Sequence, residues 1–401
     1  MEMNDIYIGR QPIFNTDMRV YAYELLFRSG SEENRAKVMG GDSATAQVIM
    51  NLFGDMGLAN VVGDRKAFIN FTEGLLLKEN RPFFPRKQVV IEVLEDIAPT
   101  AEVLAAIAKL RQDGFTIALD DYIFNPGTAP FEEYADIIKV DILDTGPKKL
   151  VQAVPVLKDK GLKLLAEKVE TREQYDFCKK LGFDYFQGYF FSRPKIIKGK
   201  SLPSNKIPVL RLLSSVYDPD IDMPQLSEII SQDVSMSQKL LKMASLSGVK
   251  HEITSIHDAV MQFGLKRLQS WASVLVLSNI DDKPSELFTM SLIRAKFCEL
   301  LGEKIGDLSK DSYFTVGLFS TLDAIMDQPL ETLLSELNFD HNIKEALVKG
   351  TGTLGRALKA IRAMEQGEID FEMPEGISPG EVSQMYLSAM EFTESLGLTD
   401  E

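Results

Sequence analysis

The stretch QVVIEVLEDIAPTAEVLAAIAKLRQDGFTIALDD, residues 88–121, decides the fold. Two short apolar runs, at 88–95 and 115–121, flank a segment at 101–114 that has apolar residues at helical spacing and ends at Gly114. Strands that are apolar on both faces and alternate with helices are typical of a parallel sheet that is buried on each side. The stretch therefore predicts one strand, helix, strand unit of an α/β fold.

The same alternation of apolar runs and amphipathic segments extends from Ile6 to Phe191. Seven or eight such units close most naturally into a (β/α)8 barrel of the TIM type. The predicted strands are VYAYELLF (20–27), KAFINF (66–71), QVVIEVLE (88–95), FTIALDD (115–121), IIKVDIL (137–143), LKLLAEKV (162–169) and DYFQGYFF (184–191).

The second half of the chain has a different pattern, without convincing strands. We expect a barrel domain over residues 1–194, a linker over 195–207 that contains Lys, Pro and Ser, and an all-helical domain over 208–401. Helical periodicity is clear in MPQLSEIISQD (223–233), in SMSQKLLKMASLS (235–247), and in SIHDAVMQFGLKRLQSWASVLVLSNI (255–280). The sequence thus predicts an α/β domain followed by an all-α domain.

Composition excludes several classes of protein. With 45% hydrophobic and 26% charged residues over 401 positions, the chain is neither disordered nor of low complexity. The formal net charge of −15 argues against nucleic-acid binding, although ten of the acids belong to the segment after Ala363, which has no basic residue. Two distant cysteines and the absence of a signal peptide or a long apolar stretch indicate a cytoplasmic protein that does not enter a membrane.

Every predicted strand of the barrel contains a polar residue within its apolar run. Because the active sites of α/β barrels lie at the carboxyl ends of their strands, these residues are candidates for a common site. Helix capping or pairing with a nearby lysine would explain any one acid, but it does not explain the set. The set consists of Glu24, Asn70, Glu92, Glu95, Asp120, Asp121, Lys139, Asp141, Glu167 and Gln187.

Carboxylates that converge in this way would repel one another unless cations lay between them. Oxygen ligands without His or Cys suit Mg²⁺ or Mn²⁺, and the Asp120-Asp121 pair suits two ions of the kind that promote in-line attack on phosphodiesters. Lys139 would orient or deprotonate a water molecule, or offset charge in the transition state. Arg28 is a candidate for binding a phosphate through two hydrogen bonds.

Eight short motifs follow one another in the first half of the chain: RQPIF (10–14), YELLFR (23–28), FINF (68–71), IEVLE (91–95), ALDDY (118–122), IKVD (138–141), AEKVET (166–171) and FQGYFFSRP (186–194). Their order and spacing resemble those of the EAL phosphodiesterase domain. That resemblance covers the first half of the chain and implies a modified TIM barrel that hydrolyses cyclic di-GMP to the linear dinucleotide with two Mg²⁺ or Mn²⁺ ions.

The resemblance also implies a role for each matching residue. Lys139, Glu167 and Gln187 would be catalytic, Gln11, Arg28 and Asp141 would contact the substrate, and Glu170 would support a loop of the site. The implied metal ligands are Glu24, Asn70, Glu92, Asp120 and Asp121.

Two positions depart from the pattern of the EAL family. The signature Glu-Ala-Leu is Glu24-Leu25-Leu26 here, and the glycine-rich loop after the Asp pair reads Tyr122-Ile123-Phe124-Asn125. An alternative function therefore stays open, namely a degenerate barrel that senses cyclic di-GMP or acts as a scaffold. The second half resembles an HDOD domain, a helical signalling module, for which we expect a regulatory or output role and a protein partner; whether the chain forms a homodimer is left open.

Overall fold

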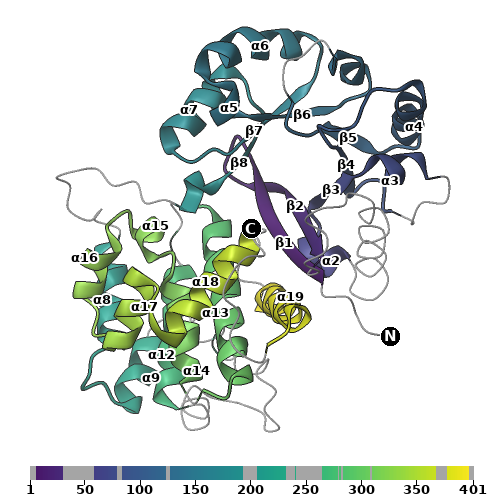
Figure 1. The fold of residues 1–401 in the computed structure, drawn as a ribbon. Coiled ribbons are helices and arrows are strands. Elements are labelled where there is room, and N and C mark those ends of the chain that lie inside the picture. The colour runs from purple at the N-terminus through teal and green to yellow at the C-terminus, as the bar shows by residue number, and fades with distance from the viewer. Residues whose placement is uncertain are drawn as a thin grey trace. The chain divides into compact units, whose positions relative to one another are not determined.

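A computed structural model of the chain describes residues 6–29, 58–78, 84–122, 127–192, 206–231, 240, 264–278, 280, 283–307, 309–366 and 377–396. The chain divides into two compact units. Figure 1 colours the chain by residue number, from purple at the N-terminus to yellow at the C-terminus. None of the helices in these ranges is long and apolar enough to cross a membrane. The first unit contains Met1–Phe191, Ala363–Asp370 and Ser378–Ser383, and the second contains Ser192–Arg362, Phe371–Ile377 and Gln384–Glu401.

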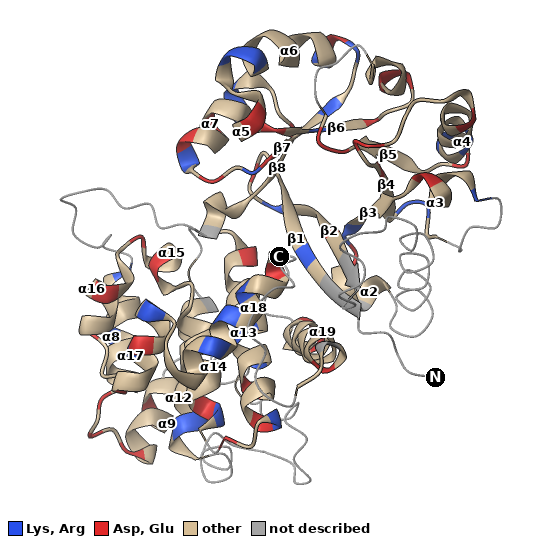
Figure 2. Ribbon diagram, in the orientation of Figure 1, with Lys and Arg blue, Asp and Glu red and all other residues tan. Residues whose placement is uncertain are grey.

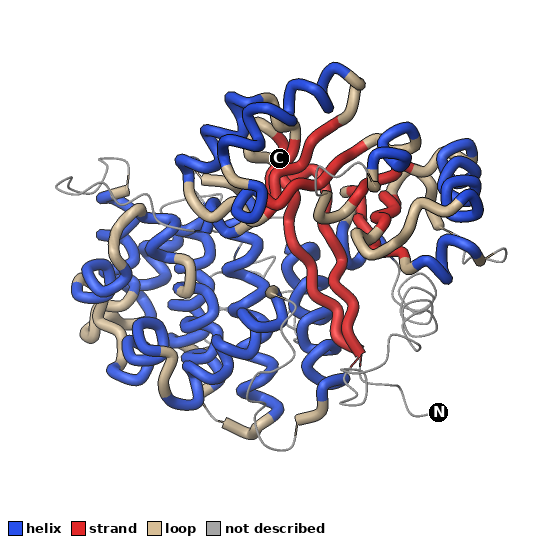
Figure 3. The backbone as a smooth tube through the Cα atoms, turned by 45° about the horizontal axis from the view of Figure 1, so that its top comes forward, coloured by secondary structure: helices blue, strands red, loops and turns tan. Residues whose placement is uncertain are grey.

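The first unit is a closed barrel in which the eight strands follow one another in sequence order (Figures 1 and 3). Its first two strands, β1 (Ile6–Asn15) and β2 (Val20–Ser29), are antiparallel, because the short connection of residues 16–19 leaves no room for a crossover. The side chain of Asn15 holds this turn by accepting hydrogen bonds from the amides of Asp17 and Arg19. β1 is also antiparallel to β8, so it is the one inverted strand of the barrel.

Strands β2 to β8 are mutually parallel, and each predicted run forms one of them. The prediction of a modified TIM barrel is therefore confirmed. β1 lies outside the predicted runs, since Gly9 and Pro12 interrupt its apolar pattern. The remaining elements are α2 (Leu58–Val62), β3 (Lys66–Phe71), α3 (Glu73–Leu77), β4 (Val89–Val93), α4 (Ala101–Gln112), β5 (Thr116–Leu119), the 3-10 helix Ala129–Glu133, β6 (Ile137–Asp141), α5 (Ile142–Thr145), α6 (Pro147–Asp159), β7 (Lys163–Glu167), α7 (Arg172–Leu181), β8 (Tyr185–Gln187) and the 3-10 helix Tyr189–Ser192.

The barrel interior is filled by side chains, as expected for eight strands. Tyr21 and Tyr185 pack against the layer of apolar side chains inside the barrel, and their rings stack with centroids 4.2 Å apart. The outer helices α4, α6 and α7 carry both acidic and basic residues, as solvated faces do (Figure 2). The interior layer takes one buried residue from each of seven strands: Ile13, Ala22, Phe68, Val90, Ala118, Ile137 and Leu165.

The second unit is helical, and none of its described residues forms a strand, which confirms the all-α prediction. Its centre is α13, whose residues are buried on nearly every side. Gly317 of α14 allows a close approach to α13, because a Cβ atom there would lie 2.3 Å from the carbonyl oxygen of Arg294. Its helices are α8 (Ile207–Val216), α9 (Met223–Ser231), α12 (Leu265–Ser278), α13 (Ser285–Lys304), α14 (Lys310–Phe319), α15 (Leu322–Met326), α16 (Leu330–Ser335), α17 (His341–Lys349), α18 (Gly352–Glu365) and α19 (Pro379–Leu396), the last two shared with the first unit.

Candidate active site

A polar layer lies directly above the apolar layer of the barrel. Side chains on a strand alternate between its two faces, so the residue two positions further along the strand also points into the barrel. In the parallel strands this step leads toward the carboxyl end, and in the inverted strand β1 it runs backward along the chain, from Ile13 to Gln11. The polar layer is made up of Gln11, Glu24, Asn70, Glu92, Asp120, Lys139, Glu167 and Gln187.

Lys139 occupies the centre of this layer, and its side chain is only 1% exposed. Its Nζ atom lies 2.6 Å from Asp120 Oδ1 and 2.7 Å from Glu92 Oε1. The same atom lies 3.0 Å from Glu167 Oε1 and 3.4 Å from Glu24 Oε2. Four carboxylates, three from the strands β2, β4 and β7 and one from Asp120 directly after β5, therefore surround one ammonium group.

Three amide side chains extend the cluster. Gln187 Nε2 lies 2.6 Å from Glu24 Oε2 and 2.9 Å from Gln11 Oε1, and it donates to both. Asn70 Nδ2 lies 3.5 Å from Glu24 Oε1, at the limit of a hydrogen bond. Glu24 is thus held by Asn70, Lys139 and Gln187, and Gln11 is linked to it through Gln187.

The cluster has more acidic groups than basic ones, because one ammonium faces four carboxyl groups. Burial, reinforced by the charge of Glu24, raises the pKa of Glu92 well above its usual range. Burial also raises the pKa of Glu167, to about 8. Burial alone would lower the pKa of Lys139, but the surrounding carboxylates, that of Glu167 first among them, raise it well above its usual value. The electrostatics of the site thus favour the binding of a further positive charge.

Asp121 and Asp141 lie beside the cluster rather than in it. Asp121 has a φ of 38°, and burial together with the charge of Asp120 raises its pKa. Asp141 caps α5 by accepting hydrogen bonds from the amides of Leu143 and Asp144. It also forms an ion pair with Lys168, and these hydrogen bonds outweigh burial and lower the pKa of Asp141.

The residues present fit divalent cations in their chemistry. The donors are carboxylate and amide oxygens without His or Cys, which suits Mg²⁺ or Mn²⁺. Several are buried oxygens without a hydrogen-bond partner, among them Asn70 Oδ1 and Glu92 Oε2. With the ammonium of Lys139 between the carboxylates, no group of three or more His, Cys, Asp or Glu side chains in the described ranges is spaced to hold an ion.

Some predicted features fall partly outside the described residues. Arg28 pairs with Tyr7 in the ribbon of β1 and β2, but its side chain is outside the described part, as are residues 123–125 of the altered loop. Glu170 directly precedes the cap of α7, and its amide donates to the side chain of Gln174 at 2.8 Å. Tyr122, at the start of the loop, donates its hydroxyl to Glu132, which also pairs with Lys160.

Two structural features beside the site were not predicted. Gly188 has a φ of 141°, and a Cβ atom there would lie 2.2 Å from the carbonyl oxygen of Val169, so only glycine fits beside this loop. Lys168 has a φ of 55° and pairs with Asp141. The Gln187-Gly188 dipeptide is a sequence signal for the glycine, whereas the sequence AEKVE (166–170) gives no sign that Lys168 adopts a left-handed backbone conformation.

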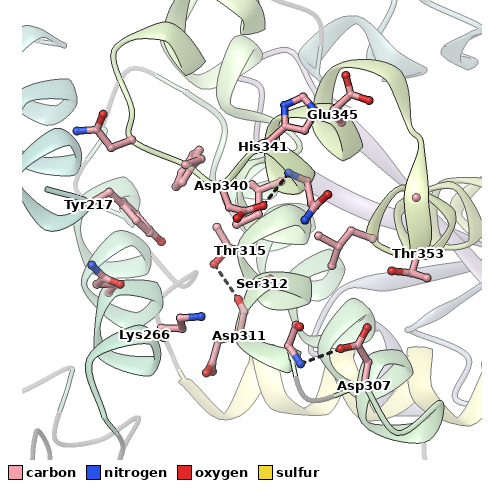
Figure 4. A pocket seen from close by; sticks show the side chains of 18 of the residues that line it. Tyr217, Lys266, Asp307, Asp311, Ser312, Thr315, Asp340, His341, Glu345 and Thr353 are labelled. Carbon is pink, nitrogen blue, oxygen red and sulfur yellow. Dashed lines mark hydrogen bonds between the residues drawn. The ribbon is translucent and has the colours of Figure 1, made fainter. Parts of the chain in front are cut away.

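The helical unit contains a cavity of about 880 Å³, which Figure 4 shows from close by. It lies among the end of α8 and the starts of α12, α14, α17 and α18. Two of its carboxylates already have partners, since Asp307 accepts hydrogen bonds from the Ser309 amide and Tyr313 hydroxyl, and Asp340 caps α17. The His257-Asp258 dipeptide of this half of the chain lies outside the described residues.

The fold and the site define a class of protein: an α/β barrel with an acidic, lysine-centred site at the carboxyl ends of its strands, followed by a helical domain. Comparison with known proteins finds the same two domains in the same order. The EAL domain family matches residues 62–194, and the HDOD domain family matches residues 202–336. The chain belongs to the family of bacterial signalling proteins in which an EAL domain precedes an HDOD domain.

Two relatives share nearly the whole chain. The uncharacterized protein YuxH of Bacillus subtilis is 34% identical over 98% of each chain. The cyclic di-GMP phosphodiesterase CdgJ of Vibrio cholerae is 33% identical over 91% of this chain and 86% of that protein. Among solved structures, a manganese and cy-diGMP complex of BlrP1 from Klebsiella pneumoniae matches 48% of this chain and 56% of that chain, with 22% identity and a TM-score of 0.40.

Proposed function

We propose that the barrel hydrolyses cyclic di-GMP to the linear dinucleotide pGpG with two divalent cations, Mg²⁺ or Mn²⁺. The observation that carries this proposal is the convergence of Lys139 with four carboxylates at the carboxyl end of the barrel, at 2.6 to 3.4 Å. The similarity to CdgJ supports the choice of substrate, since that relative is named a cyclic di-GMP phosphodiesterase.

Five residues would hold the two ions: Glu24, Asn70, Glu92, Asp120 and Asp121. They supply only oxygen donors, and partnerless buried oxygens on Asn70 and Glu92 support this assignment. When bound, such ions activate water and neutralise charge that develops on a phosphodiester. The raised pKa of Asp121, which burial and the charge of Asp120 cause, would be reversed by a neighbouring cation.

The chain's own residues would divide the remaining work. Lys139, held as an ammonium by its neighbours, offsets negative charge in the centre of the site. Gln187 orients Glu24 through a hydrogen bond of 2.6 Å, and Glu167 completes the set around the lysine. The proposed substrate contacts are Gln11, Arg28 and Asp141, and Glu170 is proposed to support the loop that follows Asp121.

The helical domain is proposed to regulate the barrel or to pass its signal to a protein partner. A second function of the barrel, as a non-enzymatic sensor of cyclic di-GMP or a scaffold, rests on the altered loop that begins at Tyr122. The other departure, Leu25, gives it less support. Its side chain is fully buried and neighbours Glu24 on the strand, so the two side chains point to opposite faces of β2.

One assay separates these functions. Purified full-length protein is incubated with cyclic di-GMP and Mg²⁺ or Mn²⁺, and the nucleotides are resolved by liquid chromatography. We expect pGpG to form, and we expect Glu24→Gln to abolish its formation while the variant stays folded. If cyclic di-GMP stays intact in the presence of folded protein, the enzymatic function is wrong. Calorimetry then distinguishes a sensor, which binds the dinucleotide, from a scaffold, which does not.

A further inference from the structure

Lys168 directly follows β7 and adopts an unusual backbone conformation. Its φ of 55° lies in the left-handed region, which a lysine side chain disfavours and glycine tolerates. The conformation is needed here, because the next residue, Val169, donates its amide to the carbonyl oxygen of Gln187 at 3.0 Å. The bend at Lys168 thus connects β7 to the loop beside Gln187. A glycine would make this bend with less strain, so the lysine side chain has to be explained by something else.

The side chain of Lys168 lies at the carboxyl end of β7 and contacts the neighbouring strand β6. It forms an ion pair with Asp141 at the end of β6, yet it is 55% exposed. Its charge also acts on Asp121, at the end of β5. Strained residues in other proteins are concentrated at ligand-binding and active sites, and Lys168 combines such strain with an ion pair to a proposed site residue, Asp141.

The charge of the site leaves a role for this lysine. The described site residues include six carboxyl groups and two lysines. Of these lysines, Lys139 is 1% exposed and surrounded by acids, so its ammonium does not face solvent. Lys168 is the exposed cation among them. The carboxylates are Glu24, Glu92, Asp120, Asp121, Asp141 and Glu167.

We infer that the Lys168 ammonium binds a phosphodiester oxygen of the dinucleotide substrate at the mouth of the barrel, with Asp141 holding the side chain in place. This inference rests on the proposed function. A flexible exposed ammonium contributes a charge-assisted hydrogen bond to a phosphate oxygen. Lys168 is therefore a substrate-binding residue, and its loss should weaken the capture of substrate more than turnover.

The kinetic test uses two variants of Lys168 and one matched control. Lys168→Gln should raise KM about tenfold with little change in kcat, and Lys168→Arg should restore most of the affinity. Added KCl should raise the KM of the wild type more steeply than that of Lys168→Gln. The control is Lys163→Gln at the opposite end of β7, where the lysine is 56% exposed and also pairs with an aspartate, Asp184. This control should keep the wild-type KM.

A third variant separates charge from backbone strain. Lys168→Gly and Lys168→Gln both remove the ammonium, but only glycine relieves the left-handed strain. We expect Lys168→Gly to unfold at a higher temperature than Lys168→Gln, while both have the same raised KM. If KM instead follows thermal stability across the variants, Lys168 acts through structure and the inference is wrong.

The inference and the proposed function fail in different ways. If the wild type hydrolyses cyclic di-GMP and Lys168→Gln has the same KM, the inference is wrong and the proposed function stands. If the wild type does not hydrolyse it, calorimetric binding replaces KM as the readout. About tenfold weaker binding by Lys168→Gln than by Lys163→Gln then supports the inference, and equal binding, or no binding by any of the proteins, overturns it.

Discussion

Replacement of Lys139 by methionine tests the electrostatics of the site most directly. The change keeps an unbranched side chain that is one atom shorter, and it removes the one ammonium that lies within 3.4 Å of four carboxylates. Removal of one partner of a buried ion pair costs about 3–5 kcal/mol, because the remaining charges are left without compensation. For a domain of this size that loss lowers the midpoint of thermal unfolding by about 10 °C.

The assay is differential scanning calorimetry of the full-length protein in EDTA. Trp271 is the single tryptophan of the chain and lies in α12, so its fluorescence identifies the transition of the helical unit. We expect Lys139→Met to move the barrel transition and to leave the Trp271 transition in place. The control is Lys158→Met, which removes a partly exposed lysine that pairs with Asp184 and should cost less than about 1 kcal/mol.

Divalent cations should reverse much of the loss in Lys139→Met, because they supply the missing positive charge. At a concentration of about 100 times Kd, binding of one ion adds about 2.7 kcal/mol to stability. Hydrolysis should stay absent even with Mn²⁺ if Lys139 takes part in the reaction. A barrel transition within about 2 °C of the wild type in EDTA would refute the reasoning, since it would mean that the four carboxylates do not depend on the ammonium.

Three further predictions concern the barrel. Burial by itself would raise the pKa of Asp184, but hydrogen bonds from Lys158 and its other partners lower it, so its contribution to stability is full above about pH 4 and is lost as the pH falls. Asp184→Asn should therefore lower the urea midpoint at pH 7 and have a decreasing effect in acid, and an equal effect at every pH would contradict this. Burial raises the pKa of the Cys178 thiol to about 12, so we expect no reaction with a thiol reagent at pH 8 until the protein is denatured, and rapid labelling of the native protein would argue against it. Gly188→Ala should lower the barrel transition and impair hydrolysis together, because its Cβ would collide with the backbone of Val169; a variant with unchanged stability would show that this loop can move.

Much of the barrel could be predicted because its strands are buried on both faces. Runs such as QVVIEVLE and FTIALDD are mostly apolar on both faces, and short amphipathic helices separate them, so the α/β alternation is visible in the sequence. The inverted strand β1 was harder to predict from the sequence, because Gly9 and Pro12 interrupt its apolar pattern and its direction depends on the short turn to β2. Strand direction is set by the connection and by closure of the barrel, which apolar periodicity does not report.

The residues of the site could be predicted for a related reason. A polar residue inside an apolar strand is conspicuous, and Glu92, Lys139 and Glu167 each stand in such a place. Their convergence on one layer follows from the two-residue period of the strands. The partner of each side chain could not be predicted, since it depends on register. Asp141 has the same sequence signal as Lys139, yet it turns to cap α5 and to pair with Lys168.

By itself, the sequence determined the two-domain order, the α/β and all-α classes, and the acids, amides and lysine that make up the polar layer. Those features are local, because burial of a strand or a helix face is recorded in the spacing of its own residues. The tertiary structure decided which of these groups meet: it placed Lys139 among four carboxylates and put Lys168 in a left-handed bend at the mouth. Closure of the barrel brings together residues more than a hundred positions apart, such as Glu24 and Lys139, and pairing over such distances is set by the geometry of the whole sheet.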